Sequence, residues 1–170
     1  VSKTDCTTGT YYLWTRVYDN AGNRATKGKV SSEFFVGTMA ITITPSTTAW
    51  TNQNVTATIA YPDVTTSSTR KAGYGTTLAN AQTSANSATA PTTSVTVSAN
   101  GYVFATATDS AGNVITASRQ ITNIDKEAPT MTNVEIKNLT TTGYDIYIYG
   151  VKDAGSGVNR VQFPTWTEAN

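Results

Sequence analysis

The side chains best suited to hold an ion or close a turn lie in two similar stretches, DNAGN at 19–23 and DSAGN at 109–113. Asp and Asn oxygens suit a hard cation such as Ca²⁺, but each stretch carries only one carboxylate. The same residue types also build a hairpin turn, because Asp accepts backbone N–H groups, Gly adopts a positive φ, and Asn tolerates the left-handed region. We therefore interpret both stretches as register-setting turns, formed by Asp19, Gly22, Asn23, Asp109, Gly112 and Asn113.

Other chemistry is poorly supported by the composition. The chain has no histidine and one cysteine, Cys6, so it has no thiolate cluster, no intrachain disulfide and no imidazole base. It also lacks a nucleophile elbow and a phosphate-binding glycine loop. We expect no enzyme activity, no cofactor and no metal. Two alternatives stay open, namely paired carboxylates for glycoside cleavage, and calcium near Asp125 and Glu127.

Aromatic residues on the strands that lead into the two turns are the candidate ligand-binding residues. Side chains alternate between the two faces of a strand, so Leu13, Thr15 and Val17 share one face and match Val103, Ala105 and Ala107. If these form the core, the other face carries an outer aromatic strip that could stack on sugar rings or meet a protein. The predicted strip consists of Tyr12, Trp14, Tyr102 and Phe104. Cross-strand packing, or contact with a neighbouring module, is the alternative for these residues.

The charge of the chain argues against several classes of partner. Twelve basic residues stand against 11 acidic ones, a formal net charge of +1, whereas a nucleic-acid or anionic-membrane partner requires clustered cations. No apolar run approaches the roughly 20 residues that a membrane-spanning helix needs. We expect no nucleic-acid partner and no membrane insertion.

An internal repeat of about 90 residues sets the expected organisation. GTYYLWTRVYDNAGN aligns with ANGYVFATATDSAGN, so that Asp19 and Asp109 stand 90 positions apart. TNQNVTATIAYPD and TTTGYDIYIYGVKD end at Asp63 and Asp153, with the same spacing. The repeat predicts the back half of a module at 1–37, a complete module at 38–125, and the front half of another at 126–170.

Most of the chain has the alternation of a β-strand. AITITP, NVTATIAY, TSVTVSA, YVFATAT and YDIYIYGV alternate with a period of two and are rich in β-branched and aromatic residues. Turn residues recur at the spacing of an all-β sandwich. The stretch at 76–91 is the exception, and we expect a loop there with at most one helical turn before Pro91.

Three stretches resemble the bacterial immunoglobulin-like modules of Gram-positive cell-surface proteins. They are WTNQNVTATI, the tyrosine-plus-DSAGN hairpin and the NIDKEAPT junction, while the last segment, with GYDIYIYGV and SGVNRVQFPTW, resembles the start of a GBS Bsp-like repeat. The resemblance implies an all-β chain of tandem immunoglobulin-like β-sandwich modules of about 90 residues. It also implies an extracellular, cell-surface or cell-wall location, with cell-wall polysaccharide, a host surface protein or neighbouring modules as partners.

The expected function is therefore a non-catalytic structural or spacer module. The alternatives are an adhesin or wall-polysaccharide binding module that uses the outer aromatics, or an accessory part of a cell-wall hydrolase whose catalytic domain lies outside this chain. Half-modules would expose sheet edges and uncovered apolar faces. We therefore expect the segments at 1–37 and about 130–170 to complement each other, either within the chain or between neighbouring copies.

Overall fold

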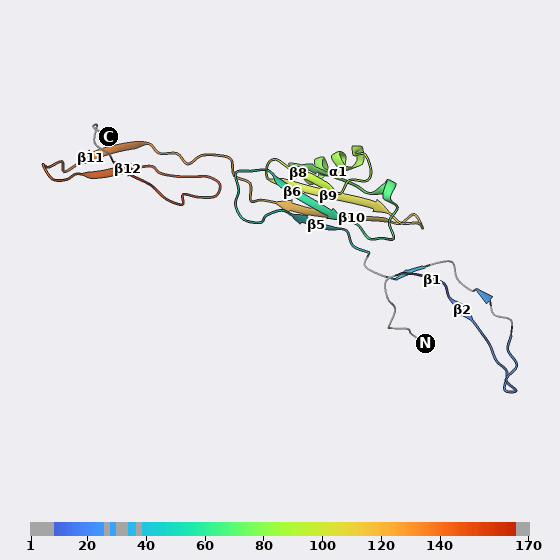
Figure 1. The fold of residues 1–170 in the computed structure, drawn as a ribbon. Coiled ribbons are helices and arrows are strands. Elements are labelled where there is room, and N and C mark those ends of the chain that lie inside the picture. Colours follow the sequence, from blue (N-terminus) through green and yellow to red (C-terminus); the bar gives the residue numbers. More distant parts are fainter. Residues whose placement is uncertain (1–8, 26–27, 30–33, 37–38, 166–170) are drawn as a thin grey trace.

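The computed structural model describes residues 9–25, 28–29, 34–36 and 39–165, and it is mostly β with one short α-helix. Three parts follow one another along the chain: an N-terminal hairpin (residues 9–36), a central sandwich (39–125) and a C-terminal part (126–165) (Figure 1). The predicted all-β class is confirmed at this coarse level. Trp166, one of the aromatics of the last segment, lies outside the described residues.

Two three-stranded antiparallel sheets make up the central sandwich. One has the order β5-β6-β8, with β5 at Thr42–Pro45, β6 at Val55–Ala60 and β8 at Ser94–Val97. The other has the order β10-β9-β7, with β7 at Lys71–Gly75, β9 at Gly101–Thr108 and β10 at Val114–Ile121. A short 3₁₀ helix, η1, at Ser67–Thr69 precedes β7.

The core lies between these sheets and follows the predicted alternation. Val103, Ala105 and Ala107 on β9 are almost completely buried, as the period-two pattern predicts. Alternate residues of β6 face them from the opposite sheet. These residues and their neighbours form one apolar cluster, which includes Ile41, Ile43, Val55, Ala57, Ile59, Val97, Ile121 and Ile124.

The stretch predicted to be a loop at 76–91 instead contains helix α1, Leu78–Ser87, so that prediction was wrong. Thr77 caps the helix by accepting a hydrogen bond from the Asn80 N–H, and Ala81 and Ala85 are its buried residues. The helix packs against the outer face of β7, where Gly73 and Gly75 leave room for its backbone. Gly73 and Gly75 are two residues apart on the strand, and Ala81 and Ala85 are four residues apart on the helix. Both separations are roughly 6 Å, so Gly73 lies against Ala85 and Gly75 against Ala81.

The N-terminal hairpin consists of two short strand pairs and the first of the two turns. β1 (Gly9–Tyr11) pairs with β4 (Phe34–Val36), and β2 (Trp14–Thr15) pairs with β3 (Gly28–Lys29). Tyr18 and Arg24 bridge beside the turn in the same register as Thr108 and Val114 of β9 and β10. Farther from the turn, Trp14 pairs with Lys29 and Thr15 with Gly28, one position beyond the register that the Tyr18–Arg24 bridge sets.

The C-terminal part is built on a hairpin of β11 (Asn133–Lys137) and β12 (Asp145–Tyr149). Its side chains separate by face: four aliphatic residues lie on one side, and charged residues and two tyrosines lie on the other. The aliphatic pairs are Val134 opposite Ile148 and Ile136 opposite Ile146. A shift of 90 residues would instead align the buried residues of β6 with the tyrosine face of β12. The strand pairing keeps the 90-residue spacing, because Asn133 pairs with Tyr149 as Ile43 pairs with Ile59, but the aliphatic residues of β12 lie on the face opposite to the one that β6 buries.

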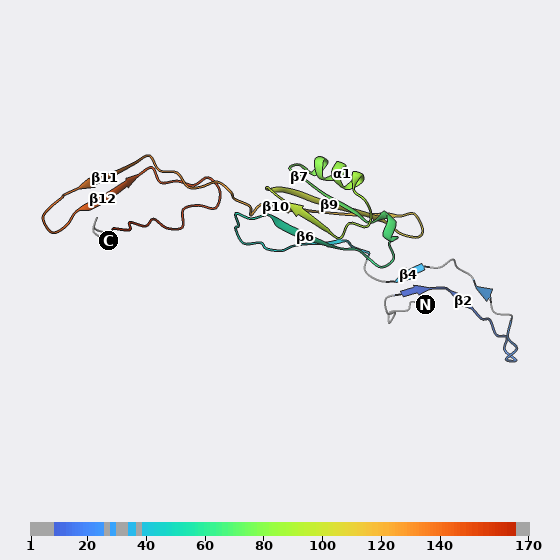
Figure 2. The ribbon, with the colours of Figure 1, turned by 45° about the horizontal axis from the view of Figure 1, so that its top comes forward.

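The two terminal hairpins lie on opposite sides of the central sandwich (Figure 1), and the turned view in Figure 2 shows the same separation. The expectation that they complement each other within one chain is therefore wrong. The central sandwich stands between them, so their apolar faces do not meet.

Candidate functional site

The two predicted turns have the same hydrogen-bond pattern. The Oδ1 atom of Asp109 accepts the backbone N–H groups of Ala111 (2.9 Å) and Asn113 (2.8 Å), and its Oδ2 atom accepts the Asn113 side-chain amide at 2.9 Å. Asp19 makes the equivalent three contacts with Ala21 and Asn23 at 2.8–2.9 Å. The turns therefore have the register-setting geometry predicted for them.

Within each turn the glycine alone takes the unusual backbone conformation. Gly22 and Gly112 have φ values of 86° and 90°, whereas the asparagines are not among the described residues with positive φ. Asn23 and Asn113 do not use the left-handed region that asparagine tolerates, and each contributes its side-chain amide to the turn. That amide is the largest cause of the lowered pKa of Asp19 and Asp109, followed by the backbone N–H of the same asparagine.

The carboxylates of the described residues are not arranged as a metal site. No group of three or more acidic, cysteine or histidine side chains that could hold a metal occurs in the described part of the chain. At Asp125, one carboxylate oxygen accepts the Glu127 N–H at 3.1 Å and the other accepts the Ser156 N–H at 2.6 Å. These hydrogen bonds, those from Ser156 first, lower the Asp125 pKa.

The four predicted aromatic residues do not form one strip. Tyr12 and Trp14 are exposed on the N-terminal hairpin, with 43% and 56% of their surfaces accessible. Tyr102 and Phe104 lie on the outer face of β9 and are half-buried. Their partners across the sheet are Gly75 and Gly73, the glycines on which α1 packs. The helix thus occupies the sheet face that was expected to be open. Ligand binding by any of the four aromatic residues stays a prediction.

A set of polar contacts that the sequence did not reveal ties the beginning of the central sandwich to its end. Thr51 and Ile124 form a parallel bridge, with the Thr51 N–H donating to the Asn123 carbonyl and the Asp125 N–H donating to the Thr51 carbonyl, both at 2.9 Å. The Asn123 side-chain amide also donates to the backbone carbonyls of Ala49 (2.7 Å) and Thr47 (3.3 Å). Arg119 reaches the Ile43 carbonyl farther along. We call these contacts the terminal tie.

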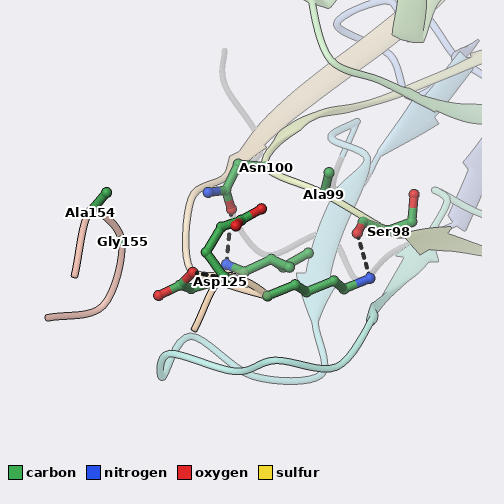
Figure 3. A pocket seen from close by; sticks show the side chains of 9 residues that line it. Ser98, Ala99, Asn100, Asp125, Ala154 and Gly155 are labelled. Carbon is green, nitrogen blue, oxygen red and sulfur yellow. Dashed lines mark hydrogen bonds between the residues drawn. The ribbon is translucent and has the colours of Figure 1, made fainter. Parts of the chain in front are cut away.

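The junction after the terminal tie is fixed by Lys126 and Asp125. The Lys126 ammonium donates to the Asn54 side chain at 2.7 Å and to the Ser98 carbonyl at 2.8 Å, while the Ile124 N–H donates to the Asn100 side chain. Across from them, Ala154 and Gly155 of the C-terminal part border an open cleft of about 540 Å³ (Figure 3). The Asp125 hydrogen bond to Ser156 links the two sides of this cleft.

The sequence contained only weak signals for these contacts. NIDKEAPT was predicted to be a junction, but the partners of Asn123 lie 74 and 76 residues earlier in the chain. A polar residue that bonds to distant backbone carbonyls leaves no local pattern.

No helix in the described part of the chain is long and apolar enough to span a membrane.

Comparisons with known proteins do not add to this site. No protein-family model matches the chain, and neither a curated protein nor a solved structure was found to be similar to it. Its function therefore has to be inferred from its own residues.

Proposed function

We propose that the chain is a non-catalytic spacer of an extracellular bacterial cell-surface protein, built from tandem immunoglobulin-like sandwich modules. The observation that carries this proposal is the terminal tie, considered together with the opposite placement of the two terminal parts (Figure 1). A spacer must transmit force from one end to the other without unfolding. The tie joins the two chain segments through which such a force would enter and leave the sandwich.

The direction of these segments determines how the tie is loaded. Arg119 contacts Ile43, and farther along both segments Ile124 bridges Thr51, so the two segments run in parallel. The chain enters near the first contact and leaves near the last. Pulling on the ends therefore slides one segment along the other, which loads several hydrogen bonds together rather than one after another. Forced unfolding depends on the unfolding rate, so such a tie supports resistance without high equilibrium stability.

Single-molecule pulling from the two ends tests this proposal. Asn123→Ala removes both side-chain hydrogen bonds to the loop between β5 and β6, and it is expected to lower the unfolding force of the central sandwich. Gln53→Ala is the matched control, because among the described residues the Gln53 side-chain amide bonds to the neighbouring Asn52 side chain and to no distant part of the sandwich. The proposal fails if the intact sandwich extends without measurable resistance, or if the two variants have the same unfolding force.

A second function, as an adhesin or wall-polysaccharide binding module, is favoured by the exposure of Trp14 and Tyr12. An accessory role in a cell-wall hydrolase would use the same aromatic surface. Binding to a glycan array that is lost in Trp14→Ala and retained in Phe104→Ala would support this function. Absence of binding across wall polysaccharides and host surface glycans would favour the spacer alone.

A further inference from the structure

We propose that copies of this chain join head to tail, with the N-terminal hairpin of one copy covering the aliphatic face of the C-terminal hairpin of the next. This inference goes beyond the spacer function and does not depend on the terminal tie. It depends on two apolar faces that stand at opposite ends of the same molecule. The central sandwich supplies an internal example of how such faces pack.

The N-terminal hairpin is a second copy of the β9–β10 hairpin around its turn. Both turns have the same three contacts to the Asp carboxylate, and in both the turn glycine has a φ near 90°. The strand residues beside the two turns pair in the same register. The face of β9 that packs in the core therefore has a counterpart on the N-terminal hairpin.

That counterpart face is exposed. Leu13 and Val17 have 53% and 65% of their surfaces accessible, whereas the equivalent Val103 and Ala107 are 0% and 1% accessible. The difference arises because β9 packs against the β5-β6-β8 sheet, and no such sheet covers the described residues of the N-terminal hairpin. Leu13 and Val17 therefore have the alternation of a core strand, although more than half of each surface is accessible.

The C-terminal hairpin offers the opposing layer. Its aliphatic pairs lie directly across the two strands, and Ile136 and Val134 have 63% and 46% of their surfaces accessible. Val158, Val161 and Phe163 from the last described segment are also partly exposed, and Val158 and Val161 border the same groove as Ile148. In the central sandwich an antiparallel pair of early strands, β5 and β6, has its apolar face covered by β9 and β10.

We assign a second copy of the chain as the occupant of this aliphatic face. The two complementary apolar faces exist in one chain but cannot meet within it. Figures 1 and 2 place them on opposite sides of the central sandwich. Each molecule thus presents one face of each kind. A contact between two different surfaces is heterologous and leaves a free surface at each end, so it produces open chains of molecules rather than closed dimers.

The opposite face of the C-terminal hairpin is unsuited to the same contact. There Lys137 contacts Glu135 at 3.0 Å and donates to the Tyr149 hydroxyl at 2.9 Å, and its ammonium lies 5.1 Å from the centre of the Tyr147 ring. These groups already satisfy one another at the surface. The proposal therefore assigns docking to the aliphatic face alone.

Sedimentation velocity of the full chain over a broad concentration series tests the proposal. The unmodified chain should form larger species as the concentration rises. Ile136→Asp should abolish this growth by blocking the acceptor face, and Leu13→Asp should abolish it by blocking the donor face. Tyr147→Asp, an equivalent change on the opposite face of the C-terminal hairpin, should leave it unchanged.

Mixing the two blocked variants is the decisive experiment. Each retains one working face, so the mixture should form 1:1 dimers and nothing larger, which also shows that both hairpins are folded. The proposal is overturned if the unmodified chain stays monomeric, as it would if another protein covers these faces. It is also overturned if the mixture does not associate, or if only one of the two substitutions matters, as in a symmetric hairpin-to-hairpin contact.

Discussion

The close approach of α1 to β7 predicts that Gly75→Ala destabilises the central sandwich. A Cβ atom on Gly75 would stand 2.6 Å from the Asn80 Cβ and carbonyl carbon, and it would also overlap the Ala81 nitrogen. Ordinary contacts between such atoms are about 3.5–4 Å. Backbone atoms cannot rotate away as a side chain can, so the helix has to move outward by roughly 1 Å.

The expected cost follows from two opposing effects. Overpacking of this kind costs about 1–3 kcal/mol, and the overlap with backbone places the cost near the upper end. Replacing glycine restricts the unfolded chain and returns roughly 0.4–1 kcal/mol. The net loss is about 2 kcal/mol, and for a domain of this size it corresponds to a fall in Tm of about 10 °C.

Thermal unfolding followed by circular dichroism measures this effect. Gly112→Ala is an informative comparison, because nothing lies within 4 Å of the added methyl group, while the φ of 90° is unfavourable for alanine. It should cost about 1–2 kcal/mol, for conformational reasons alone. If Gly75→Ala has an unchanged or higher Tm, α1 is not seated on β7 and the account of the covered sheet face is refuted.

Four further predictions concern polar groups. Tyr61→Phe should leave the free energy of unfolding in urea unchanged or raise it by up to about 1 kcal/mol, because no described residue bonds to the buried hydroxyl. Burial raises the pKa of Tyr61 to about 12, although the charge of Arg70 acts in the opposite direction. Tyr74→Phe, which loses a 2.8 Å hydrogen bond to the Ala99 carbonyl, should instead cost about 1 kcal/mol. The pKa of Asp109 lies below its ordinary value of 3.8, so the stabilising effect of its charge is complete above pH 3.8 and is lost as the pH falls through the lowered pKa. The fall in Tm on acidification should therefore be smaller in Asp109→Asn than in the unmodified chain. An equal fall in the two proteins would contradict this prediction. Asp125→Ala should accelerate amide hydrogen exchange at Ser156 and leave Gly157, which is bonded to Asp153, protected; equal exchange at Ser156 in both proteins would show that the link across the cleft is absent.

Local chemistry explains which parts of the fold were predictable from sequence. Asp19 and Asp109 find their partners within four residues, so the turns could be recognised without knowledge of the rest of the chain. The burial of Val103 and Ala105 followed from alternation along one strand. In both cases the information lies within a few neighbouring residues.

Features that depend on distant partners were missed for a physical reason. Helix α1 buries Ala81 and Ala85, and its other apolar residues are Leu78 and Ala79 in the first turn, so its apolar stripe is too weak to distinguish it from a loop. Its better signal lies outside the helix, in the alternate glycines of β7 that admit its backbone. Asn123 is equally inconspicuous in the sequence, because its bonds to the first loop depend on the closed sandwich.

The two copies of the turn separate what a hairpin determines by itself from what it acquires by packing. Asp19 forms the same bonds as Asp109 although Val17, two residues before it, is exposed whereas the equivalent Ala107 is buried. The turn geometry therefore does not require an opposing sheet, whereas burial of the adjacent face does. This difference is the reason to expect association through the faces: the N-terminal hairpin already has the turn and register of a packed strand pair, so little further ordering opposes its docking.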